Sequence, residues 1–112
     1  MQSMGTASTI VLNEDKILEE EKNLEVMWLK IDNEYTKYGL KKINKGVYTD
    51  AGRDSDWMHF GKANIALAEK RWLTDYVVSW LWFNSDGGKT EDDFVVEDII
   101  TEYAKAKREL VI

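Results

Sequence analysis

Apolar positions within residues 55–84 recur at helical spacing and mark the segment around which the chain is organised. At 100° per residue, one continuous stripe consists of Ile65, Trp72, Tyr76, Trp80 and Phe83. The last two turns are apolar on nearly every side, so a helix here needs neighbours on more than one face. Ser55 is a favourable N-cap, and the glycine-containing turn after Asn84 ends the pattern. We therefore predict a central helix over residues 55–84.

Residues 76–83 also permit a strand. They are rich in β-forming residues, and a turn-like Ser-Asp-Gly-Gly segment separates them from a second apolar run, so a hairpin of 76–83 with 93–98 remains an α+β alternative. Such a strand would be apolar on both faces and would need cover on both sides. The preceding residues 63–73 are strongly helical and continue without a breaker. The helix is therefore the preferred prediction.

Two further helices are predicted at the ends of the chain. Residues 13–38 carry a heptad-like apolar seam with one defect at Glu21, and Asn13 is a plausible N-cap. Residues 90–111 begin with a capping-box pattern at Thr90, with acidic residues in the first turn and basic residues in the last. Together with residues 55–84, they predict an all-α fold, a small antiparallel bundle of three main helices.

The remaining residues define the domain organisation. Residues 1–12 are predicted to be a flexible N-terminal arm, and residues 13–112 a single helical domain. The connection 39–54 is long for a small domain, and long loops often carry function. It is also basic and is the candidate partner-binding loop, with candidate residues Lys41, Lys42, Lys45 and Tyr48.

Composition narrows the function classes. The 112 residues include 44% hydrophobic residues, enough for a folded core, and no cysteine, so a disulfide framework or thiolate metal site is excluded. The net charge of −6 argues against direct nucleic-acid binding, although residues 36–73 are basic. We see no secretory signal, and no apolar run approaches the roughly 20 residues of a membrane span. A cytoplasmic protein is expected.

No residue pattern predicts catalysis or a cofactor. His59 is the only histidine, and no triad spacing surrounds it. Asp50, Asp54 and Asp56 lie in a glycine-containing loop, but their spacing does not match a calcium-binding loop. Residues 87–90 resemble the end of a phosphate-binding loop and lack its first glycine. We predict no catalytic, metal-binding or cofactor-binding residues, and a protein that is not an enzyme.

The aromatic content is the least ordinary feature, because five tryptophans exceed what a three-helix core needs. Exposed tryptophan and tyrosine are favoured interface anchors. The predicted protein interface consists of Trp57, Tyr76, Trp80, Trp82 and Phe83, and among the tryptophans Trp57 or Trp82 is the preferred interface anchor. The leading hypothesis is a non-enzymatic protein–protein interaction module that self-associates as a homodimer, in the manner of a small acidic inhibitor or immunity-type protein.

Two alternatives come from other classes. An acidic mimic that blocks a nucleic-acid-binding protein would place the acidic clusters at residues 14–25 and 91–98 on one face. A small ligand-binding or catalytic bundle would need a concave pocket that contains His59 and a buried carboxylate.

Overall fold

The computed structural model describes residues 6–85 and 94–101. Five strands are present in this part of the chain: β1 (Thr6–Leu12), β2 (Lys41–Asn44), β3 (Val47–Thr49), β4 (Val77–Ser85) and β5 (Phe94–Asp98). The helices of the same part are α1 (Glu14–Glu19), α2 (Leu24–Thr36), α3 (Asp56–Ala68) and α4 (Arg71–Thr74). The prediction of an all-α bundle is therefore wrong, and the fold class is α+β.

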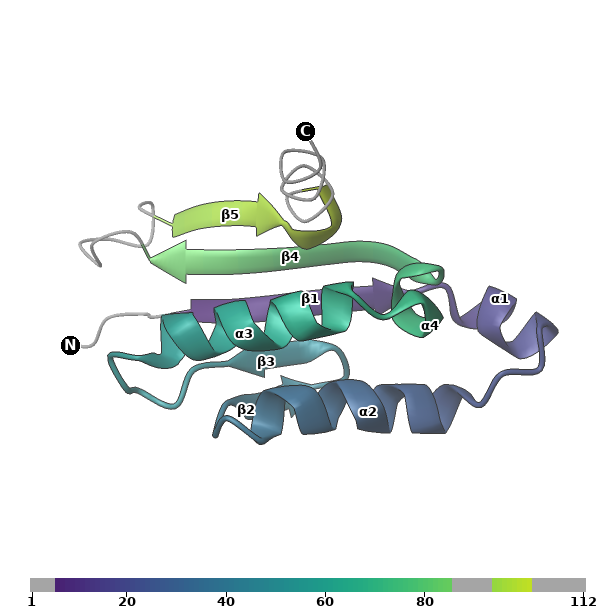
Figure 1. Cartoon of the computed structure of the whole chain (residues 1–112), viewed down its shortest axis with the longest axis horizontal. Coiled ribbons are helices and arrows are strands. Elements are labelled where there is room, and N and C mark those ends of the chain that lie inside the picture. Colours follow the sequence, from purple (N-terminus) through teal and green to yellow (C-terminus); the bar gives the residue numbers. More distant parts are fainter. Residues whose placement is uncertain (1–5, 86–93, 102–112) are drawn as a thin grey trace.

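The strands form one antiparallel sheet in the order β2-β3-β1-β4-β5. The first four strands and their helices follow the β-α-β-β-α-β connectivity of the split βαβ, or ferredoxin-like, arrangement. The two longest helices, α2 and α3, cover the same face of the sheet (Figure 1). Within the described residues, no helix combines the length and apolar character that crossing a membrane requires.

The predicted central helix is divided into three elements. Helix α3 ends at Ala68, the short α4 turns the chain, and β4 begins at Val77. The continuous helix is wrong because β4 gains an antiparallel partner on each side, β1 and β5, that the local sequence does not reveal. The fold class is the α+β alternative, in which residues near 76–83 and 93–98 are extended and pair with each other. Both faces of β4 are indeed apolar, as that alternative required.

The N-terminal predictions also need correction. Thr6–Leu12 is not a flexible arm but the central strand β1, which pairs with both β3 and β4. The helix predicted at 13–38 is broken into α1 and α2, because Glu21 adopts a positive φ of 58°. Asn23 then restarts the helix by accepting a hydrogen bond from the Val26 N–H at 3.0 Å.

The helix predicted at residues 90–111 can be compared with the structure only over residues 94–101. Residues 94–98 form β5, so a helix over that segment is wrong, while 90–93 and 102–111 lie outside the described residues. Helical structure begins at Ile99, where Asp98 Oδ1 accepts a hydrogen bond from the Thr101 N–H at 3.1 Å. Asp98 therefore caps the start of this segment, while the capping role predicted for Thr90 lies outside the described residues.

A polar network crosses the core between the sheet and the helices. The Tyr35 hydroxyl donates to Asn64 Oδ1 at 2.5 Å and accepts from Trp80 Nε1 at 3.2 Å. Ser8, a fully buried residue of the central strand, donates to the same Asn64 oxygen at 3.3 Å. Tyr35 also stacks on Tyr48, with ring centroids 4.2 Å apart. The network therefore joins α2 and α3 to β1, β3 and β4 at one point.

Tyr35→Phe is expected to lower the free energy of unfolding by about 1–3 kcal/mol, because the buried Trp80 indole N–H loses its acceptor and Asn64 Oδ1 keeps only the longer hydrogen bond from Ser8. Tyr38→Phe is the matched control, since Tyr38 is half-buried and contributes no hydroxyl to this network. Urea denaturation of both variants measures the difference. Equal losses from the two substitutions would show that the network contributes little.

Candidate protein-interaction surface

The start of α3 is anchored by a buried carboxylate. Asp56 is 1% exposed, and its Oδ2 accepts from the backbone N–H of Ala51 at 2.6 Å and of Arg53 at 3.1 Å. The Arg53 guanidinium lies 2.6 Å from Asp56 Oδ1. Burial opposes ionisation, but these hydrogen bonds outweigh it and hold the pKa of the Asp56 carboxyl below its ordinary value. The first turn of α3 is therefore rigidly placed without a side-chain hydrogen bond from Ser55, the predicted N-cap.

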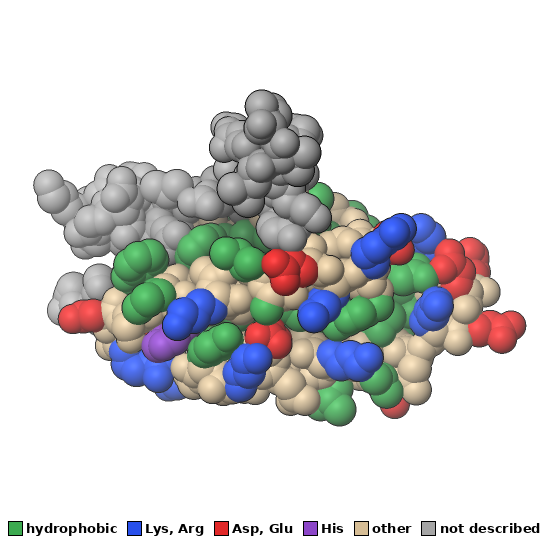
Figure 2. Space-filling model, in the orientation of Figure 1, with side chains coloured by type: hydrophobic (Ala, Val, Ile, Leu, Met, Phe, Trp, Pro, Cys, Tyr) green, Lys and Arg blue, Asp and Glu red, His purple; other side chains and the backbone are tan. Residues whose placement is uncertain are grey.

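The outer side of α3 carries an apolar surface. Trp57 is 60% exposed, Met58 42% and Ile65 55%, and Lys62 lies among them on the same side of the helix. These four residues are the α3 surface. Figure 2 shows hydrophobic side chains at the surface of this face, among lysines and arginines. Large apolar side chains that gather on one rigid helix are typical of a contact site for another molecule.

Four of the five predicted interface residues are less accessible than expected. Trp80 is 1% exposed and Tyr76 7%, while Trp82 and Phe83 are half-buried. They lie in β4, an inner strand, or immediately before it. The Trp82 indole N–H donates to Thr6 Oγ1 at 2.7 Å, which holds that side chain against the sheet. Of the predicted set, Trp57 alone is mostly exposed.

The candidate partner-binding loop forms the β2–β3 hairpin. Tyr48 is fully buried, and its hydroxyl donates to Asp32 Oδ1 at 2.6 Å. Lys42 pairs with the same Asp32 carboxylate at 2.9 Å, and Lys45 pairs with Glu14 at 3.0 Å. Lys41 is exposed on β2. The hairpin therefore uses most of these side chains internally, and edge lysines also discourage pairing with other strands.

His59 and two of the loop aspartates, Asp50 and Asp56, have structural partners, whereas Asp54 is exposed. His59 stacks on Tyr38 with ring centroids 5.6 Å apart, and its Nδ1 lies 3.5 Å from Asp56. Asp50 accepts hydrogen bonds from the Thr6 and Gly52 N–H groups, so its oxygens stabilise the loop. Among residues 6–85 and 94–101, no cluster of three or more histidine or acidic side chains could hold a metal ion.

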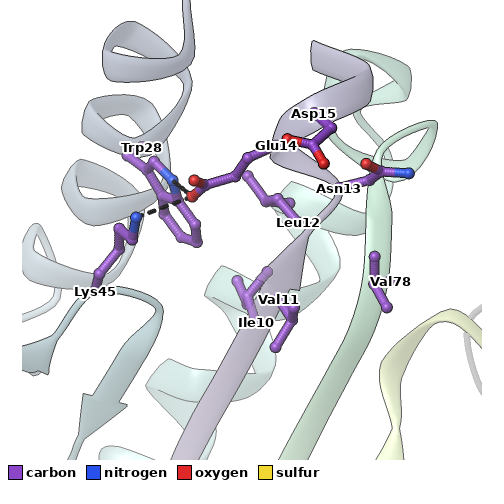
Figure 3. A pocket seen from close by; sticks show the side chains of 9 residues that line it. All are labelled: Ile10, Val11, Leu12, Asn13, Glu14, Asp15, Trp28, Lys45 and Val78. Atoms are coloured by element: carbon purple, nitrogen blue, oxygen red, sulfur yellow. Dashed lines mark hydrogen bonds and ion pairs between the residues drawn. The ribbon is translucent and has the colours of Figure 1, made fainter. Parts of the chain in front are cut away.

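An open pocket of about 610 Å³ lies at the end of β1 (Figure 3). Its polar wall is Glu14, which accepts from Trp28 Nε1 at 3.1 Å and pairs with Lys45 at 3.0 Å. The contacts with Lys45 and Trp28 hold the pKa of the Glu14 carboxyl below its ordinary value. Val11 and Val78 are exposed at the opposite rim, where a register shift leaves Val78 without a partner in β1. Two of its charged side chains, Glu14 and Lys45, are therefore already paired with each other.

Comparison of the chain with protein-family models, curated proteins and solved structures gave no match. The β-α-β-β-α-β connectivity alone does not identify a function, because this arrangement serves many. Function is therefore inferred from the surfaces of the described residues.

Two members of the α3 surface, Met58 and Ile65, were not among the predicted interface residues. A helical projection from Trp57 places Met58 and Ile65 at about 100° and 80°, whereas the buried Phe60 and Leu67 lie on the opposite side. That signal was present in the sequence. It was overlooked because the helix was predicted to extend to residue 84, and most of the interface was assigned to its apolar last two turns.

Proposed function

We propose that this chain is a non-enzymatic protein-binding module whose contact site is the α3 surface. The observation that carries the proposal is the 60% exposure of Trp57 on a helix whose first turn is fixed by Asp56. Tryptophan is enriched among the few residues that dominate binding energy, and rigid placement reduces the entropy lost on association. An exposed helix face of this kind fits recognition in a groove of the partner.

The two alternatives receive less support. His59 and the buried Asp56 do lie together, but Asp56 is engaged by Arg53 and backbone N–H groups, and neither residue lines the pocket of Figure 3. The hypothesis of an acidic mimic that blocks a nucleic-acid-binding protein requires the acidic residues of 91–98 to lie beside those of 14–25. Most of the acidic residues of 91–98 lie outside the described residues.

Photo-crosslinking tests the proposal. A crosslinking amino acid at position 57 is expected to capture one partner protein in cells that make this chain, whereas the same residue at position 78 is not. Val78 is the matched control because it is 64% exposed and lies in the sheet rather than on α3. A partner captured from position 78 and not from 57 would contradict the proposal, as would capture from neither position.

Trp57→Ala is expected to weaken the partner complex by about 2 kcal/mol or more, roughly 30-fold in dissociation constant. Because the side chain is mostly exposed, the free energy of unfolding should change by no more than about 0.5 kcal/mol. Titration of the captured partner by isothermal calorimetry measures the first quantity, and urea denaturation the second. Val78→Ala should leave the affinity unchanged. Equal affinity for wild type and Trp57→Ala would remove Trp57 from the interface.

A further inference from the structure

A basic pocket lies between the start of α2 and α4, away from the α3 surface. Its volume is about 300 Å³, and Val26, Met27 and Trp72 supply its apolar lining. The exposed side chains of Lys22, Lys30 and Arg71 surround it, with Asp75 as the acidic member of the lining. The Lys30 amine lies 5.1 Å from the centroid of the Trp72 ring. The pocket therefore offers an apolar floor and a cationic rim.

The cations of this rim have no acidic partners within the described residues. Four other basic side chains, Lys37, Lys42, Lys45 and Arg53, each pair with an acidic side chain of the chain itself. No ion pair within residues 6–85 and 94–101 includes Lys22, Lys30 or Arg71. The rim is thus available to an acidic group from outside.

Acidic groups of this kind are present at the end of the neighbouring helix α1. Leu18 of α1 is 58% exposed, and three glutamates follow it directly, forming with it the acidic tip Leu18, Glu19, Glu20 and Glu21. The tip borders the pocket, because the Tyr76 hydroxyl at the pocket wall donates to Glu20. Figure 1 shows α1 beside α4 at one end of the molecule, and in Figure 2 acidic side chains gather at that end.

Leu18 does not fill the pocket of its own chain, since it is exposed and is not part of the lining. Adjacent patches of opposite charge become self-complementary when a twofold axis passes between them, because each patch then faces its opposite on the second copy. An apolar side chain with acidic neighbours is complementary to an apolar pocket with a basic rim in polarity and in charge. At about 300 Å³ the pocket has room for an aliphatic side chain such as that of leucine.

We propose that two copies of this chain associate about such a twofold axis. Each copy inserts Leu18 into the basic pocket of the other and places its glutamates against Lys22, Lys30 and Arg71. This interface is separate from the α3 surface and does not depend on the proposed function. Dimerisation through the basic pocket leaves both α3 surfaces exposed.

Charge reversal tests the proposal directly. The pocket variant carries Lys30→Glu and Arg71→Glu, and the tip variant carries Glu19→Lys and Glu21→Lys. Analytical ultracentrifugation from about 1 µM to about 1 mM covers the affinities of small, transient interfaces. We expect a concentration-dependent wild-type dimer. Each variant alone should show at least about a 100-fold higher dissociation constant, because like charges then face each other twice.

A mixture of the two variants provides the decisive test of the proposed interface. An equimolar mixture of the pocket and tip variants is expected to recover dimers, since both contacts of that heterodimer again join opposite charges. The control variant, Lys37→Glu with Lys41→Glu, makes the same charge change at exposed positions outside both the basic pocket and the α3 surface, and it should dimerise like wild type. Circular dichroism and urea midpoints establish that all variants fold. A monomeric wild type at every concentration, dimers that survive either reversal, or a mixture that stays monomeric would each overturn the proposal.

Discussion

Gly46→Ala is expected to lower the free energy of unfolding by about 3 kcal/mol or more. Gly46 has a φ of +77°, which side-chain-bearing residues adopt at a cost of about 1–2 kcal/mol. A β-carbon at this position would also lie 2.3 Å from the backbone carbonyl oxygen of Ile10. The same contact includes a hydrogen bond from the Ile10 N–H to the Gly46 carbonyl at 2.8 Å. The β2–β3 turn and the central strand would therefore have to separate.

Gly52→Ala is the matched control for this prediction. Gly52 also has a positive φ, of 87°, but no atom lies within 4 Å of a β-carbon built there. Its substitution should cost only the conformational part, about 1–2 kcal/mol. Urea denaturation of both variants separates the conformational cost from the collision with Ile10. Equal destabilisation would mean that the hairpin moves away from β1 without loss.

Asp56→Ala is expected to lower the free energy of unfolding by about 2–4 kcal/mol, because it leaves two backbone N–H groups without their acceptor and removes the ion pair with Arg53. Asp54→Ala removes the same charge from an exposed position two residues earlier and should change stability by no more than about 0.5 kcal/mol. Urea denaturation at neutral pH compares the two variants. A similar, small loss from both would show that the loop does not depend on the buried carboxylate.

The pKa of Asp56 adds a dependence on pH. Hydrogen bonds hold the folded-state pKa below the unfolded value of about 3.9, so the stabilisation is complete above that value and is lost as pH falls through the folded-state pKa. The free energy of unfolding of the wild type should therefore decrease more steeply below about pH 4 than that of Asp56→Ala. Parallel acid profiles for the two proteins would show that Asp56 titrates normally in the folded state.

The sequence predicted local features of the fold well. The apolar seam identified α2, and the N-cap position predicted at Ser55 is followed by a helix that begins at Asp56. Each of these features is determined by residues within a few positions of one another. The break before α2 was also readable, because Asn23 is a favourable N-cap.

The strands β1 and β4 were missed for physical reasons. Two inward positions of β1 are Thr6 and Ser8, which are buried through hydrogen bonds to Trp82 and Asn64, so β1 lacks an apolar alternation. Residues of β4 satisfy helical and strand patterns equally, and its pairing with β1, far away in the sequence, decides between them. The same error affected the interface prediction. Four of its five residues lie in β4 or directly before it, and only Trp57 lies elsewhere.

The position of β1 between β3 and β4 has a consequence for synthesis of the chain on the ribosome. About 65 residues separate the end of β1 from the start of β4, and translation at about 5–20 residues per second needs about 3–13 s to produce them. During that interval the apolar Ile10 and Leu12 lack the strand that covers one side of β1. Nascent chains halted before residue 77 should therefore be bound by chaperones, and those extended beyond the sheet should be released.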